Sequence, residues 1–278
     1  MTVETLTAIV NHVLPEPHAG LLNGILFGTK ATLSKELYNA LIRTGTLHIV
    51  ALSGMNITII ALIMRSILLP FVSRRIASAL TILGIILFVW FVGASPSVVR
   101  AAIMGSISLL AIVLGRQAWS LLSWVLALGI MLVIKPSWIG DISFQLSALA
   151  TIGIILFGGS VPSYDPHAHK TIKEAQRMLG VFKKSIIENF RLTLAAQVFT
   201  IPLIFFQFHR LSLISPLSNV LIGWTIQIIT ILGLLISIIG ILFLPLAQII
   251  ALPTWVFLQY LLTMVDLTSK IPFASIGW

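Results

Sequence analysis

The sequence predicts an all-α fold, a polytopic transmembrane helical bundle of about eight spans preceded by amphipathic and re-entrant helices. Composition is the first reason: 58% of the 278 residues are hydrophobic and only 9% are charged, whereas a soluble domain carries about 25% charged residues. The mean hydropathy of +1.08 is the second reason. The third is that several apolar runs reach the roughly 20 residues with which a helix crosses a bilayer. We therefore expect one membrane domain and no large soluble domain.

Residues 1–45 are expected to form an amphipathic and re-entrant lead-in to the first span. Residues 1–15 suit a short amphipathic helix or a linker. The stretch from His18 to Gly28 is apolar and glycine-rich but too short to cross a membrane, which predicts an interfacial or re-entrant segment. Residues Ala31 to Arg43 carry leucines at helical spacing beside basic residues, which predicts an amphipathic helix on the membrane surface.

Residues 46–270 are expected to form the transmembrane domain. The first span lies in the long apolar run from Leu47 to Val72. The later spans are expected at about Ile76–Val92, Ser97–Leu114, Ala118–Ile134, Asp141–Phe157, Asn189–Phe208, Pro216–Phe243 and Leu246–Val265. A basic loop around residues 158–187 separates the fifth span from the sixth, and residues 271–278 are expected to be a tail.

The formal net charge of +9 has two explanations. It can reflect affinity for a polyanion such as nucleic acid, or the enrichment of Lys and Arg in cytoplasmic loops, and we favour the second as the main cause. The loops after the first, third and fifth spans are richer in Lys and Arg than those on the other side. This bias predicts a multi-pass protein of the cytoplasmic membrane with these loops inside and both termini outside. The chain has no cysteine, which excludes disulfides and thiolate metal sites.

The first expected span carries four polar or small residues in its first half, namely His48, Ser53, Gly54 and Asn56. Polar side chains at membrane depth are costly and usually face protein or water. On one continuous helix, Asn56 would lie about 80° and Ser53 about 140° from His48. The three side chains would then share one arc and leave the opposite side apolar. We expect this polar seam to be the functional centre.

Polar residues in later spans have both functional and structural explanations. Arg100 could set a fixed positive charge against a phosphate or a buried acid, or reach the headgroups as an anchor. Asp141 could pair with Arg100, line or gate a polar path, or cap the N-terminus of its helix. Gln145, one turn further on, is not explained by capping and favours a polar interior, and Asn219 adds a polar group in the seventh span.

Established catalytic motifs are missing from the sequence. There is no His-Glu-x-x-His, no Gly-x-Ser-x-Gly and no phosphate-binding loop. His48 and Ser53 invite a hydrolase interpretation, but on one helix they would point about 140° apart, so the histidine could not readily serve as the base. We expect no catalytic residue, no metal and no cofactor, and therefore a protein that is not an enzyme.

Five blocks of the sequence, in order, resemble the competence domain of the ComEC-type DNA-uptake proteins. The blocks are Leu14 to Gly28, His48 to Gly54, Pro96 to Ala102, Pro136 with Asp141 to Ser147, and Pro216 to Asn219. The resemblance covers nearly all of the chain. It implies a channel that admits single-stranded DNA across the cytoplasmic membrane in natural transformation. A channel or transporter for another solute, such as an anion, is the alternative.

By analogy with that family, eight residues are expected to form the DNA path or its polar lining: His48, Ser53, Gly54, Asn56, Arg100, Asp141, Gln145 and Asn219. Such a path contacts the nucleic-acid backbone without reading its sequence. Asp141 would repel phosphates, so we assign it to pairing or gating. Many relatives carry a second histidine in place of Asn56, and asparagine does not titrate near neutral pH.

The resemblance also implies partners. Full-length relatives often carry an oligonucleotide-binding-fold domain before this region and a metallo-β-lactamase-like domain after it, and neither is recognisable here. We therefore expect the DNA receptor and the nuclease to be separate proteins. No nucleotide-binding motif is present, so an ATP-driven motor is also expected to be separate. Single-stranded DNA and membrane lipid are the direct partners, and a homo-oligomer remains open.

Overall fold

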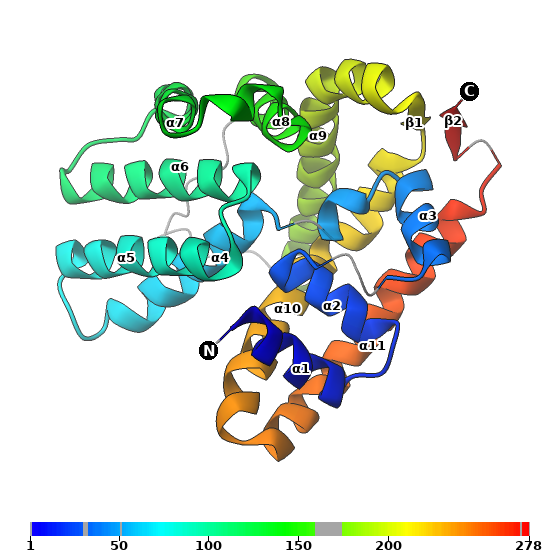
Figure 1. Cartoon of the computed structure of the whole chain (residues 1–278), viewed down its shortest axis with the longest axis horizontal. Coiled ribbons are helices and arrows are strands. Elements are labelled where there is room, and N and C mark those ends of the chain that lie inside the picture. Colours follow the sequence, from blue (N-terminus) through cyan, green and yellow to red (C-terminus); the bar gives the residue numbers. More distant parts are fainter. Residues whose placement is uncertain (1, 30–32, 51, 159–173, 273, 278) are drawn as a thin grey trace.

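The computed structural model describes residues 2–29, 33–50, 52–158, 174–272 and 274–277 as a helical protein with one short strand pair (Figure 1). The elements of the N-terminal half are α1 (Val3–Val13), α2 (His18–Phe27), α3 (Lys35–Arg43), the 3₁₀ helix η1 (Leu47–Val50), α4 (Gly54–Leu68), α5 (Arg74–Val92), α6 (Pro96–Val113) and α7 (Ser120–Ile134). They are followed by the 3₁₀ helix η2 (Pro136–Gly140), α8 (Ile142–Phe157), α9 (Glu174–Phe208), β1 (Arg210–Ser212), α10 (Ser215–Leu242), α11 (Leu244–Ser269) and β2 (Ser275–Gly277). The predicted helical class is confirmed.

Five of the described helices are long and apolar enough to cross a membrane: α5, α6, the part of α9 from Phe190 to Gln207, α10 and α11. The expectation of about eight spans is therefore met only in part. The other three expected spans are the apolar helices α4, α7 and α8, which have 15 or 16 residues each. This is short of the roughly 20 residues that a hydrocarbon core of about 30 Å requires.

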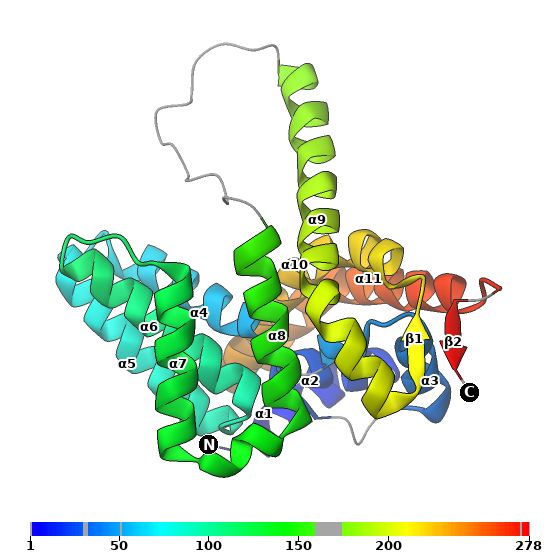
Figure 2. The same ribbon diagram turned by 90° about the horizontal axis from the view of Figure 1, so that it is seen from above.

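The helices gather into two groups with α8 and α9 between them (Figure 1). In one group α4, α5 and α6 pack together, and α7 packs against α6 and α8. In the other group α1, α2, α3, α10 and α11 share the largest buried apolar cluster. Figure 2 shows α8 and α9 side by side, and α9 also contacts α10, so these two helices join the groups.

Helix α2 is the centre of the second group, because all ten of its residues are buried. The apolar side chains of His18–Phe27 therefore pack against protein, and the expectation of an interfacial or re-entrant segment stays a prediction. Gly233 of α10 permits this contact. A Cβ atom there would come within 2.7 Å of Leu22 and 2.9 Å of Leu26. In contrast, α3 buries Leu41 and exposes its charged residues, which confirms the predicted amphipathic helix.

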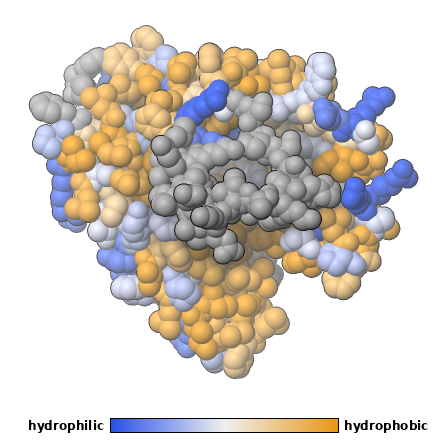
Figure 3. Space-filling model, turned by 180° about the vertical axis from the view of Figure 1, so that it is seen from behind, coloured by the Kyte–Doolittle hydropathy of each residue, from blue (hydrophilic) through white to orange (hydrophobic). Residues whose placement is uncertain are grey.

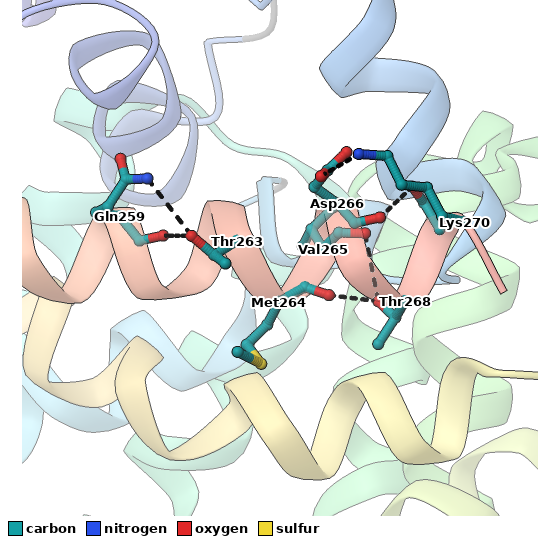
Figure 4. A network of polar contacts seen from close by, with 8 residues as sticks. Gln259, Thr263, Met264, Val265, Asp266, Thr268 and Lys270 are labelled. Atoms are coloured by element: carbon teal, nitrogen blue, oxygen red, sulfur yellow. Dashed lines mark hydrogen bonds and ion pairs between the residues drawn. The ribbon is translucent and has the colours of Figure 1, made fainter.

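A polar contact fixes α2 against α11. The Nε2 atom of His18 donates a hydrogen bond to Oε1 of Gln259 over 2.8 Å, and the imidazole ring lies 5.3 Å from the ring of Trp255. Gln259 begins a polar stripe on the second half of α11, shown in Figure 4, which ends in the ion pair of Asp266 and Lys270 at 2.6 Å. Charged residues near the end of a spanning helix reach the membrane surface.

Two segments that were expected to be a loop and a tail contain regular secondary structure. Helix α9 begins at Glu174, so the second part of the segment expected as a basic loop around 158–187 is helical, and residues 159–173 lie outside the described residues. The expected tail contributes β2, which pairs antiparallel with β1 and sets Ile276 opposite Leu211. This pair holds the last described residues against the connection between α9 and α10.

The surface of the molecule has the character of a membrane protein. Figure 3 shows hydrophobic residues over much of the coloured surface of one face. Trp90, Val133 and Leu242 are between 83% and 84% exposed. Side chains of this size and exposure are typical of helices that face lipid, because in water such an extensive apolar surface would cause aggregation.

Candidate polar path

The expected first span is interrupted. Within the run from Leu47 to Val72, residues Leu47–Val50 form the short 3₁₀ helix η1, and the α-helix begins only at Gly54. Ser53 is the N-cap residue of α4, with φ −105° and ψ 160°. The predicted arc of His48, Ser53 and Asn56 on one helix is therefore wrong. Ser and Gly favour a helix start over a helix interior, and packing of the preceding residues against α2, α6 and α10 fixes the start at Gly54.

Two glycines of the α2 region let the interrupted segment pass through the core. A Cβ atom on Gly24 would collide with the side chain of Val50. A Cβ atom on Gly28 would lie 3.1 Å from the side chain of Leu52, and Gly28 also has a φ of +74° that favours glycine. The chain before α4 is thus packed closely against the C-terminal half of α2.

Two further glycines mark the ends of the interrupted segment. Gly45 has a φ of +68°, and a Cβ atom there would lie 2.6 Å from the side chain of Ser215 at the start of α10. A Cβ atom on Gly54 would lie 3.0 Å from the Cβ atom of Ala101 in α6. Residues 45–54, which we call the crossing segment, therefore run from the first turn of α10 to the first turns of α6.

Arg100 lies beside the end of the crossing segment. Its Nη1 atom donates hydrogen bonds to the carbonyl oxygen of Ser147 and to Oγ1 of Thr151, both in α8. We call these three residues the Arg100 cluster. The Nη2 atom would be 3.2 Å from a Cβ atom on Gly54, and the Nε atom is buried without a hydrogen-bond partner. Among the described residues no carboxylate is paired with this guanidinium.

Asp141 is not the partner of Arg100. Its Oδ1 atom accepts hydrogen bonds from the backbone amides of Ser143 and Phe144 at 2.7 and 3.1 Å, so it is the N-cap of α8. The capping alternative is confirmed, since a carboxylate at a helix N-terminus satisfies free amides and the helix dipole. Gln145 also has a local contact, because its Nε2 atom donates to the carbonyl oxygen of Ile139 in η2 at 2.8 Å.

Asn56 is a buried structural contact. Its side chain is 3% exposed, and its Nδ2 atom donates to the carbonyl oxygen of Ile25 over 2.8 Å. This bond joins α4 to the last turn of α2, where backbone carbonyls have no partner within the helix. His48 differs from it. The side chain is exposed, and its Nδ1 atom lies 3.1 Å from the carbonyl oxygen of Gly45.

Asn219 belongs to a second polar group, at the other end of the crossing segment. Ser215 accepts hydrogen bonds at its Oγ atom from the Nε2 atom of Gln197 at 2.8 Å and from the Nδ2 atom of Asn219 at 3.3 Å. We call these three residues the Ser215 cluster. Gly45 packs directly against Ser215, so the cluster joins α9, α10 and the crossing segment.

The eight predicted residues therefore do not share one lining. Arg100 and Gly54 lie together, and Asn219 lies near the opposite end of the crossing segment. Asn56 binds the backbone of α2, Ser53 is the N-cap residue of α4, and His48, Asp141 and Gln145 make contacts close in sequence. Ser147, Thr151 and Ser215 were not predicted as site residues. Ser147 and Thr151 are four residues apart and so share one helix face, a signal that could have identified them.

Comparison with known proteins gives one family and two curated relatives. The model of the family described as Competence protein matches residues 25–278. ComE operon protein 3 of Bacillus subtilis (strain 168) is 25% identical over 217 residues, which cover 78% of this chain and 26% of the relative. The uncharacterized protein YcaI of Escherichia coli (strain K12) is 25% identical over 233 residues, 80% of this chain and 29% of the relative. The aligned region thus spans less than a third of either relative. No solved structure matches.

Proposed function

The chain belongs to the competence protein family, and from this premise we propose that it forms a path for single-stranded DNA across the cytoplasmic membrane. Membership of the family supports a membrane protein with a role in competence for DNA uptake. The proposal goes further in naming the transported species and the path. In it, the chain carries out no covalent chemistry, and a separate nuclease and ATP-driven motor act on the strand.

Arg100 is the observation that carries the proposal. Its half-buried guanidinium belongs to α6, a helix that is long and apolar enough to span a membrane. A cation at this depth is costly unless it meets an anion or water, and ionisable residues within spans mark substrate paths. Its bonds to Ser147 and Thr151 use Nη1 alone and fix the orientation of the group. The Nη2 donor remains for a phosphate, whereas the Nε donor also has no partner but is enclosed by protein.

The crossing segment supports a path at the same place. Irregular backbone at membrane depth is tolerated only where it is buried in protein or lines a water-filled cavity. In transporters, interrupted helices of this kind form the substrate site, with a helix N-terminus directed at an anionic group. Here α4 begins at Gly54, directly beside Arg100. A sugar–phosphate backbone contacted only through its phosphates would pass without regard to base sequence.

Uptake of labelled DNA by competent cells tests the proposal. In cells whose only copy carries Arg100→Ala, we expect uptake to fall at least about tenfold, because loss of one charge-assisted contact costs more than about 1.4 kcal/mol. Arg75→Ala is the matched control, since Arg75 is an exposed arginine in the first turn of α5, and DNA uptake by cells with this variant should stay near that of the unmutated cells. Membrane abundance of each variant is measured in parallel.

The same experiment separates the main alternative. Arg100 would also suit a smaller anionic solute, because its free donors recognise a phosphate or carboxylate wherever it comes from. If uptake is unchanged in Arg100→Ala at normal abundance, Arg100 is an anchor and the proposed path is wrong. If unmutated cells take up no DNA although they take up labelled inorganic phosphate in an Arg100-dependent manner, the chain is an anion transporter.

A further inference from the structure

A small groove lies between the end of α6 and the start of α7, outside the polar path. Its volume is about 220 Å³. Leu110 of α6, Leu114 directly after α6 and Leu122 of α7 contribute apolar walls, and residues of the turn between the helices also line the groove. Figures 1 and 2 show this turn at the outer end of the α4–α7 group, the same end as the turn between α4 and α5.

The mouth of the groove has a different character from its walls. Arg116 is the charged residue among those that line it, and its side chain is exposed. Trp119 also lines the groove and is 75% exposed. Tryptophan prefers the interface between hydrocarbon and headgroups, and a guanidinium pairs with phosphate oxygens at that level. The two side chains therefore mark the groove as open to the membrane surface.

The surroundings of the groove determine what can fill it. Helix α6 is among the membrane-spanning candidates, so the turn that follows it lies at a surface of the bilayer. Leu114 and Leu122 are 70% and 55% exposed, which a membrane protein allows only toward lipid or another apolar group. A phospholipid carries in one molecule a phosphate that suits Arg116 and an acyl chain that suits the leucines. A soluble ligand would match only one of the two.

We propose that this groove binds one anionic phospholipid, with its phosphate on Arg116, its glycerol backbone beside Trp119 and the first part of an acyl chain against Leu110 and Leu122. The headgroup would be bound by the charge of Arg116, and the acyl chain would be bound by apolar contact with the leucines. An anionic lipid should bind more tightly than a zwitterionic lipid with the same acyl chains. In the zwitterionic lipid, the positive group of the headgroup competes with Arg116 for the phosphate. The proposal does not depend on DNA transport, since the groove lies away from Arg100.

Native mass spectrometry of the purified full chain tests the site. The probes are phosphatidylglycerol and phosphatidylcholine with identical acyl chains, each added to the delipidated protein in mild detergent. We expect the unmutated chain to retain one phosphatidylglycerol at least about fivefold more strongly than phosphatidylcholine, a ratio typical of one basic residue at a membrane surface. Arg116→Gln should remove this preference.

Two further variants make the result specific. Arg75→Gln removes an exposed arginine at the same end of the bundle and should leave the preference unchanged. Ala111→Phe introduces a large side chain into the groove wall and should weaken retention of both lipids, with thermal unfolding measured to confirm that the protein is folded. Equal effects of Arg116→Gln and Arg75→Gln would overturn the proposal, because they indicate a diffuse charge effect. An unmutated chain without preference would overturn it too.

Discussion

Arg100 and Asn56 show how differently two polar residues of a membrane segment can be used. Both were expected to line a path. Arg100 keeps donors without partners beside the start of α4, which fits that role. The side-chain amide of Asn56 instead donates a hydrogen bond to the carbonyl oxygen of Ile25, in a site that is buried from solvent. Residue type and helical spacing predict a polar interior, but they do not reveal whether another backbone group already occupies the side chain.

Replacing Asn56 should therefore reduce stability more than it reduces transport. In Asn56→Ala the buried carbonyl oxygen of Ile25 loses its donor, which costs about 1–3 kcal/mol. The measurement is denaturant or thermal unfolding of the purified protein in detergent. Asn39→Ala, an exposed asparagine on α3, is the control and should change the unfolding free energy by no more than about 0.5 kcal/mol. Equal stability of the two variants together with lost DNA uptake would return Asn56 to the path.

At the level of single elements, the helix ends were predictable where local chemistry sets them. The expected span ending at Val92 ends there in α5, and Pro96 begins α6 because proline suits the first turn of a helix. The start of α4 was not predicted. Hydropathy reports an apolar run from Leu47 onwards, whereas the helix start at Gly54 depends on packing against α2, α6 and α10, which are distant in sequence.

Asp141 provides a prediction at this scale, because capping and charge can be separated in α8. Asp141→Ala removes the acceptor for two backbone amides and should destabilise the protein by about 1 kcal/mol. Asp141→Asn retains a good capping side chain without the charge, so both stability and DNA uptake should stay close to the unmutated protein. The check is unfolding in detergent and uptake in cells for both variants. Lost uptake in the stable Asp141→Asn protein would support a gating charge instead.

In the whole molecule, the crossing segment connects two separately packed groups of helices. It starts at Gly45 against α10 and ends at Gly54 against α6, and Val50 and Leu52 fill space left by glycines of the α2 region. The composition of the chain predicted a helical membrane protein because hydropathy is a property of each segment alone. It could not predict this passage, because the glycines that make it possible find their partners only in the folded protein.

Gly45 tests this passage. Gly45→Ala places a side chain 2.6 Å from Ser215 and an alanine at a φ of +68°, and we expect a loss of at least about 2 kcal/mol in unfolding free energy. Gly129→Ala is the matched control, because a Cβ atom on Gly129 in α7 meets nothing within 4 Å. That change should be neutral or stabilise the helix by up to about 1 kcal/mol. Unfolding in detergent measures both, and similar stability of the two variants would show that the close approach at Ser215 is not needed.

The contact between Gly45 and Ser215 also sets an order of events during biosynthesis. The ribosome delivers Gly45 long before Ser215, so the crossing segment emerges without the surface on which it finally rests. At that stage the apolar run from Leu47 to Val72 is long enough to enter the bilayer as one continuous helix. We infer that its first turns unwind only after α10 has been inserted, and that the polar path is assembled as a late event of membrane insertion.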